Sequence, residues 1–177
     1  MDTPTALETF AAIAEQLAAL GRALYQKGWV LGTSGNLSAV VEREPLKLAI
    51  TSSGRDKSTL TADEILLIDA DGGVLLGNGR PSAETLLHLA VVRLRGAGAV
   101  LHTHSVWSNI LSDAHARQGG LSIEGYEMLK GLEGVSTHEH REWLPVIENS
   151  QDMTGLAVSV EETLRKHPDA HGMPFTS

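Results

Sequence analysis

Apolar residues recur every three or four positions along residues 5–26, which is the period of an amphipathic helix. Thr5 and Glu8 have the spacing of a capping box at the start of this segment, and Lys27 and Gly28 end it. Weaker patterns of the same kind, each near turn or capping residues, predict further helices. These helices are expected over residues 82–95, 105–116, 127–132 and 150–166.

Short apolar runs bounded by turn residues predict strands between these helices. The predicted strands cover residues 37–42, 46–51, 65–69, 74–76, 99–104 and 144–147. Tight turns join the first pair and the second pair of these strands as hairpins. Hairpins flanked by helices predict an α/β fold with a central, mostly antiparallel sheet. Because no repeat or linker interrupts the pattern, we expect a single domain over residues 1–177.

Composition narrows the chemistry that this fold can carry. The chain has 177 residues, no cysteine, and 14 Lys and Arg against 22 Asp and Glu, so its formal net charge is −8. Without thiolates, any metal must be bound by imidazole and carboxylate groups. The acidic balance disfavours nucleic-acid binding, which depends on Lys and Arg. No apolar run reaches the roughly 20 residues of a membrane helix, and no signal-peptide pattern is present, so we expect a cytoplasmic protein without membrane contact.

All eight histidines lie at residue 88 or later, and one pair stands out. Residues i and i+2 of a strand project from the same face, so the predicted strand 99–104 would place His102 and His104 side by side. Such a pair can bind a divalent ion, Zn²⁺ above all, or can simply form hydrogen bonds at a strand end. His138 and His140 have the same spacing, but they lie in a charged run that is typical of a solvated connection.

Two loops of small residues have the composition of a phosphate site. Residues 32–36 and 52–54 combine glycine, which lets backbone N–H groups converge, with hydroxyl and amide side chains. Lys57 either adds a positive charge nearby or is solvated on the surface. Ser82 is expected to cap the following helix, and Glu84 either complements the helix dipole or acts as a base or metal-side carboxylate.

Six segments taken in order resemble the class II aldolase and adducin superfamily. These segments are residues 32–38, 50–54, 80–88, 95–105, 126–132 and 144–149. The first four are typical of the whole superfamily. The segments Glu-Met-Leu-Lys-Gly-Leu and Pro-Val-Ile-Glu-Asn within the last two are similar to the methylthioribulose-1-phosphate dehydratase branch rather than to the sugar-phosphate aldolases.

The resemblance implies a three-layer fold and a homotetrameric lyase of methionine salvage that dehydrates 5-methylthioribulose 1-phosphate. It further implies one Zn²⁺ per subunit on His102 and His104, with Glu127 as general acid and base. Zinc would polarise the substrate carbonyl while Glu127 moves the proton. Glu84 matches the glutamate that works at the metal in the aldolases. The residues that match the family's phosphate-binding positions are Asn36, Ser53, Gly54 and Ser82.

The chain departs from the family pattern after residue 170. The family's third zinc histidine belongs to a later strand, which a final helix follows, and we expect both elements to be lacking here; His171 matches only the residue that opens that block. Glu84, or more remotely His138, His140 or His171, would then complete the metal site. Two alternatives to the dehydratase therefore stay open. One is a class II sugar-phosphate aldolase, and the other is an inactive truncated relative that serves as an interaction module.

Overall fold

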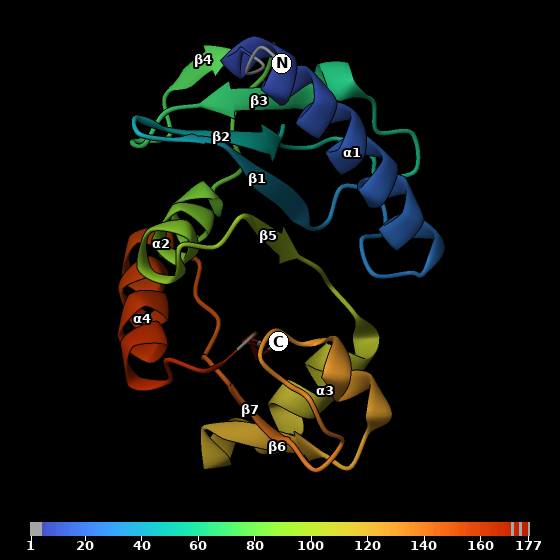
Figure 1. Cartoon of the computed structure of the whole chain (residues 1–177), viewed down its shortest axis with the longest axis vertical. Coiled ribbons are helices and arrows are strands. Elements are labelled where there is room, and N and C mark those ends of the chain that lie inside the picture. The colour runs from blue at the N-terminus through green and yellow to red at the C-terminus, as the bar shows by residue number, and fades with distance from the viewer. Residues whose placement is uncertain (1–4, 171, 174, 177) are drawn as a thin grey trace. The chain divides into compact units, whose positions relative to one another are not determined.

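A computed structural model describes residues 5–170, 172–173 and 175–176. Its backbone contacts divide the chain into a first unit, residues 1–105, and a second unit, residues 106–177 (Figure 1). The single domain expected over residues 1–177 stays a prediction. None of the helices formed by the described residues combines the length and the apolar character that crossing a bilayer requires.

The first unit is built on a five-stranded antiparallel sheet with the strand order β4-β3-β2-β1-β5. Hairpins join β1 to β2 and β3 to β4, and a longer connection that includes η1 joins β2 to β3. After β4, α2 returns the chain so that β5 pairs with β1 at the other edge. The elements are α1 (Ala6–Gln26), β1 (Asn36–Arg43), β2 (Leu46–Thr51), the 3₁₀ helix η1 (Ala62–Glu64), β3 (Ile65–Ile68), β4 (Val74–Leu76), α2 (Thr85–Arg95) and β5 (Ala99–His102).

Alternation of side chains along β2 divides the buried residues of this unit into two cores. Ala49 belongs to the core formed with α1, whereas Leu48 and Ile50 belong to the core formed with α2. In both cores apolar side chains are removed from water, which stabilises the folded state by roughly 25 cal/mol per Å² of apolar surface buried. The first unit therefore has the expected three layers, α1, sheet and α2, which Figure 1 shows as one helix on either side of the sheet.

The second unit combines a two-stranded antiparallel sheet with helices. Its elements are α3 (Val106–His115), the 3₁₀ helix η2 (Ala116–Gln118), β6 (Gly120–Glu124), the 3₁₀ helix η3 (Glu127–Gly131), β7 (Arg141–Pro145) and α4 (Met153–Lys166). The buried face of α4 consists of Leu156, Val160 and Leu164, which follow one another at intervals of four residues.

Several predicted boundaries in the first unit were confirmed, the predicted ends of β1 and β3 were off by one residue, and two boundaries were wrong by more than that. Thr5 forms the predicted capping box with Glu8, and β2 and β4 have the predicted limits. The helix expected from Ser82 begins at Thr85, because the Ser82 hydroxyl accepts a hydrogen bond from the backbone N–H of Glu84 within a preceding turn, at 3.3 Å. The strand expected to reach His104 ends at His102.

In the second unit the sequence prediction missed β6 and misplaced its partner. β6 follows Gly119, begins at Gly120 and has only five residues, so the two glycines favoured a turn over a strand at this point of the sequence. Its partner β7 covers Arg141–Pro145 instead of residues 144–147, because the charged residues before Trp143 pair with β6. The helix expected from residue 150 begins at Met153, where Asp152 caps it through the N–H of Thr154.

Candidate functional site

The register of the first unit's sheet brings two of the predicted site segments together. Asn36 at the start of β1 is the antiparallel partner of His102 at the end of β5. Gly35 precedes Asn36 with φ of +69°, and a Cβ on it would lie 2.6 Å from the carbonyl oxygen of His102. This approach requires glycine, because the position has both a positive φ and no room for a side chain. The small-residue loop 32–36 is thereby held against the end of β5.

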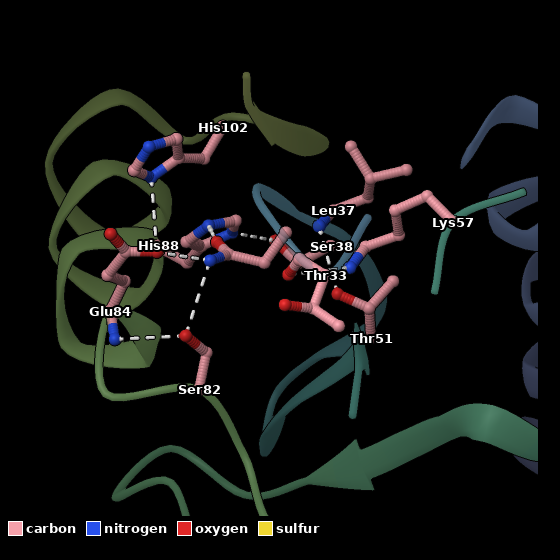
Figure 2. A network of polar contacts seen from close by, with 10 residues as sticks. Thr33, Leu37, Ser38, Thr51, Lys57, Ser82, Glu84, His88 and His102 are labelled. Carbon is pink, nitrogen blue, oxygen red and sulfur yellow. Dashed lines mark hydrogen bonds and ion pairs between the residues drawn. The ribbon is translucent and has the colours of Figure 1, made fainter. Parts of the chain in front are cut away.

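Asn36 connects the serine and the glutamate of the segment before α2. Its side-chain Nδ2 donates to the Ser82 hydroxyl at 3.3 Å and to Oε2 of Glu84. The same glutamate oxygen lies 3.4 Å from Nδ1 of His102. Figure 2 shows Ser82, Glu84 and His102 within one network of polar contacts at the entrance to α2. The fold thus brings together four residues that were predicted separately to serve phosphate and metal binding.

His88 anchors this network from α2, and the sequence analysis gave it no role. It is buried, with Nδ1 2.7 Å from the Ser38 hydroxyl and Nε2 hydrogen-bonded to Oδ1 of Asn36. Burial, and to a smaller extent the charge of His102, lowers the pKa of His88 to about 3. Because the Asn36 amide nitrogen faces Ser82 and Glu84, Oδ1 faces His88 and Nε2 of the neutral ring carries the proton.

His102 and His104 lie side by side even though the strand ends between them. Their rings stack with centroids 4.8 Å apart and an interplanar angle of 16°. The backbone N–H of His104 donates to the carbonyl of Trp29 at 2.6 Å, which holds the residue after β5 has ended. Burial lowers the pKa of His102, an effect that the charge of Glu84 opposes and that of His104 reinforces. A lowered pKa favours the neutral imidazole, which is the form that binds metal.

A cavity of about 210 Å³ gathers the two small-residue loops and the Glu84 network. Its lining consists of Thr33, Ser34, Gly35, Asn36, Ser52, Ser53, Gly54, Lys57, Ser82, Glu84 and His104. All four predicted phosphate-binding residues line this cavity. The backbone N–H of Ser53 donates to the carbonyl of Arg80 at 2.9 Å, so this residue offers a ligand its hydroxyl rather than its amide. Hydroxyl and amide donors on glycine-containing loops are suited to an anion.

Glu127 belongs to the second unit, in the 3₁₀ helix η3. Its carboxylate lies 2.6 Å from Nζ of Lys130 and 3.3 Å from Nδ1 of His138. The side chain is 70% exposed, so the pair with Lys130 contributes little to the stability of the unit. A carboxylate with a cation and an imidazole at hydrogen-bonding distance has the groups that proton transfer requires.

The remaining histidines do not join the first pair into a larger cluster within the described residues. His140 forms an ion pair of 2.9 Å with the buried Glu142, and His138 contacts Glu127. His171 lies outside the residues that the structure describes. Among those described, no group of three or more His, Cys, Asp or Glu side chains is placed to hold a metal ion.

Comparison with protein families gives a match over most of the chain. The family described as Class II Aldolase and Adducin N-terminal domain matches residues 15–173. The chain belongs to this family. The matched range includes β1 to β5, the residues that line the cavity and both histidine pairs.

Within the class II aldolase and adducin family, several proteins similar to this chain are named methylthioribulose-1-phosphate dehydratase. The protein of that name from Marinobacter nauticus is 40% identical over 164 residues, which cover 92% of this chain and 78% of the relative. The one from Methylococcus capsulatus is 44% identical over 168 residues, which cover 94% and 78%. A solved structure, the L-fuculose-1-phosphate aldolase of Thermus thermophilus, matches with a TM-score of 0.64 and 25% identity over 92% of this chain and 74% of the aldolase.

These matches confirm two sequence predictions, the family and the class II aldolase-like α/β fold. The individual roles of the site residues stay predictions. The sequence analysis missed the role of His88, although a signal was present. His88 follows Glu84 by four residues at the start of a predicted helix, a spacing that places both on one helical face.

Proposed function

We propose that this chain is a methylthioribulose-1-phosphate dehydratase of methionine salvage. It removes water from 5-methylthioribulose 1-phosphate and gives 2,3-diketo-5-methylthiopentyl 1-phosphate. The observation that carries this proposal is one cavity in which two anion-binding loops adjoin Glu84 and His104, beside His102. The names and the 40% and 44% identities of the relatives support the choice of substrate.

The polar lining binds the phosphate and thereby orients the ketose. Ser53 and Ser82 supply hydroxyl groups, and Gly54, with φ of +74°, lets the backbone turn beside the cavity. Asn36 holds Ser82 and Glu84 at fixed positions through the two hydrogen bonds of its amide. Binding energy from this remote group positions the reacting carbons, which lowers the entropic part of the barrier.

The residues at the other side of the cavity have the donor types that Zn²⁺ accepts. His102 and His104 provide two adjacent imidazoles, and Glu84 provides a carboxylate 3.4 Å from His102. We propose that His102 and His104 hold one zinc ion per subunit, with Glu84 as the carboxylate beside the metal. When bound, zinc acts as a Lewis acid on the substrate carbonyl.

Glu127 is proposed as the general acid and base of the dehydration. In this role it takes the proton from the carbon beside the carbonyl and returns it as the hydroxyl on the next carbon leaves as water. Ketonisation of the resulting enol gives the diketone, so the reaction needs no oxidant. Lys130 and His138 hold the Glu127 carboxylate in place through contacts of 2.6 Å and 3.3 Å.

The first experiment compares substrates. The purified chain, supplied with zinc, is assayed with methylthioribulose 1-phosphate and, separately, with L-fuculose 1-phosphate. We expect turnover of the first substrate only. Turnover of the aldol substrate alone would replace the proposal by the second candidate, a class II sugar-phosphate aldolase, which the match to the Thermus thermophilus enzyme favours. Turnover of neither would support the inactive relative.

The second experiment separates metal binding from proton transfer. Glu127→Gln should abolish turnover and leave zinc content and melting temperature unchanged, because the side chain is exposed. His102→Ala should lose stoichiometric zinc and activity together. A His102→Ala variant that kept full zinc and full turnover would remove this histidine from the proposed metal site. The homotetramer expected from the resemblance is tested by light scattering on the same preparations.

A further inference from the structure

Lys57 is a lysine in an uncommon environment. Its side chain is 1% exposed, although lysine is almost never fully buried in proteins unless it has a partner. Burial of a charged ammonium is costly because the group loses its hydration. In agreement with this cost, burial lowers the pKa of Lys57, while the more distant charges of Asp56 and Glu64 act in the opposite direction.

The contacts of Lys57 tie it to the two loops of the cavity. Nζ donates to the carbonyl oxygen of Arg55 at 2.9 Å and to that of Thr33 at 3.4 Å. Thr33 belongs to the loop 32–36, and Arg55 directly follows the loop 52–54. The backbone N–H of Lys57 also donates to the carbonyl of Gly32 at 2.9 Å. Lys57 therefore holds together the two loops that line the cavity.

These contacts leave the positive charge without an anion. Within the described part of the chain, no carboxylate forms an ion pair with Lys57. Glu64 pairs instead with Arg55 at 3.5 Å, and the Asp56 carboxylate accepts the backbone N–H of Ser58 at 2.8 Å. An ammonium has three N–H donors, and carbonyl oxygens accept two of them. One donor is therefore left for a ligand in the cavity that Lys57 lines.

The two sides of the cavity carry opposite charges, so a charged ligand is expected to bind in one orientation. Figure 2 shows Lys57 reaching Thr33 on one side of the network, whereas Glu84 and His102 lie on the other side. An anion is attracted to the lysine and repelled by the carboxylate of Glu84, and the attraction is the stronger of the two because Lys57 is buried whereas the Glu84 side chain is 27% exposed. The lining therefore favours a ligand whose anionic end faces Lys57.

We propose that Lys57 is the cation that binds the substrate's phosphate and sets the direction in which the sugar phosphate enters the cavity. This inference rests on the proposed function for the identity of the sugar, and only on the cavity for the binding of phosphate. It makes the lysine a specificity-determining residue, because an uncharged sugar gives up the contact that offsets the buried charge. Methylthioribulose without its phosphate should then bind much more weakly.

The alternative is that Lys57 only holds the loops together. Lys57→Met removes the charge and keeps the length of the apolar stem, and Lys47→Met is the matched control. Lys47 belongs to the same unit, pairs with Glu42 at 2.7 Å outside the cavity, and its replacement changes the net charge by the same amount. Binding of inorganic phosphate is measured by calorimetry for all variants, and KM and kcat are measured with methylthioribulose 1-phosphate.

We expect Lys57→Met to weaken phosphate binding and to raise KM by about ten- to a hundredfold, the range for a hydrogen bond to a charged group, with a smaller change in kcat. Lys57→Arg should recover most of the phosphate affinity, and Lys47→Met should match the wild type. Unchanged phosphate affinity in a folded Lys57→Met variant would overturn the proposal. A loss of kcat at unchanged KM and unchanged phosphate affinity would also overturn it, since that pattern indicates a role in loop structure only.

A measurement on the wild type covers the case in which Lys57→Met fails to fold. With ¹³C-labelled lysine, the ε-carbon resonance of Lys57, assigned through Lys57→Arg, should shift saturably as inorganic phosphate is added. No shift at saturating phosphate would refute the proposal. The calorimetric measurement of phosphate binding and the shift of the lysine resonance are both independent of turnover. If the wild type binds phosphate through Lys57 but does not convert methylthioribulose 1-phosphate, the proposed function fails and the phosphate site stands.

Discussion

Mild acid should destabilise the first unit through His88. The ring is 1% exposed, and both of its nitrogens are engaged, Nδ1 by the Ser38 hydroxyl and Nε2 by the Asn36 side chain. A protonated ring would carry a hydrogen on Nδ1 as well and would place a charge among buried groups. The folded state therefore keeps His88 neutral, and its pKa is lowered to about 3, chiefly by burial.

The size of the effect follows from proton linkage. The pKa of an unfolded-chain histidine is about 6.5, so between about pH 6.5 and pH 3 the unfolded state binds one proton more than the folded state. The free energy of unfolding then falls by about 1.4 kcal/mol for each unit by which the pH decreases. The contribution is fully present above about pH 6.5, and at pH 5 about 2 kcal/mol of it is lost. The loss at pH 5 is the same for any folded-state pKa of His88 well below about 5.

The assay is urea unfolding at pH 7 and pH 5, with a chelator present so that metal loss does not contribute. His88→Gln removes the titrating ring and keeps an amide that can face Asn36. Leu89→Ala, at the next position of α2 and equally buried, is the control because it destabilises the core and leaves His88 in place. We expect the wild type and Leu89→Ala to lose about 2 kcal/mol more than His88→Gln between the two pH values. Equal losses in all three proteins would refute the buried neutral histidine.

Two further predictions concern the backbone and the hydrogen bonds around the cavity. Gly35→Ala should lower the free energy of unfolding by more than about 2 kcal/mol and reduce zinc content, because its Cβ would meet the carbonyl of His102. Gly96→Ala is the control, since Gly96 has φ of +60° but open space around it, and this change should cost only about 1 kcal/mol. Equal losses in urea unfolding would contradict the clash at Gly35. Ser38→Ala should cost about 1–3 kcal/mol, because it leaves Nδ1 of the buried His88 without its donor, and a variant as stable as the wild type would show that the 2.7 Å contact does not matter.

Local patterns were sufficient for most of the secondary structure. The capping box at Thr5 and the apolar period of α1 are properties of neighbouring residues, so the sequence predicted this helix and its start. The limits of β2 and β4 followed from their bounding turns. β6 and the start of β7 could not be predicted in this way, because each strand is short and depends on pairing with a partner some twenty residues away.

For the site, the sequence by itself determined the residue types and the order of the motifs, and these were enough to identify the family. Tertiary structure decided which of those residues meet. The pairing of Asn36 with His102 depends on the β1–β5 register, which joins segments far apart in the chain. The burial of Lys57 and His88 was likewise decided by packing, because a charged or polar side chain is exposed by default until neighbouring elements enclose it. Distance along the chain carries no information on such contacts, so only the folded structure could reveal a buried lysine that lines the cavity.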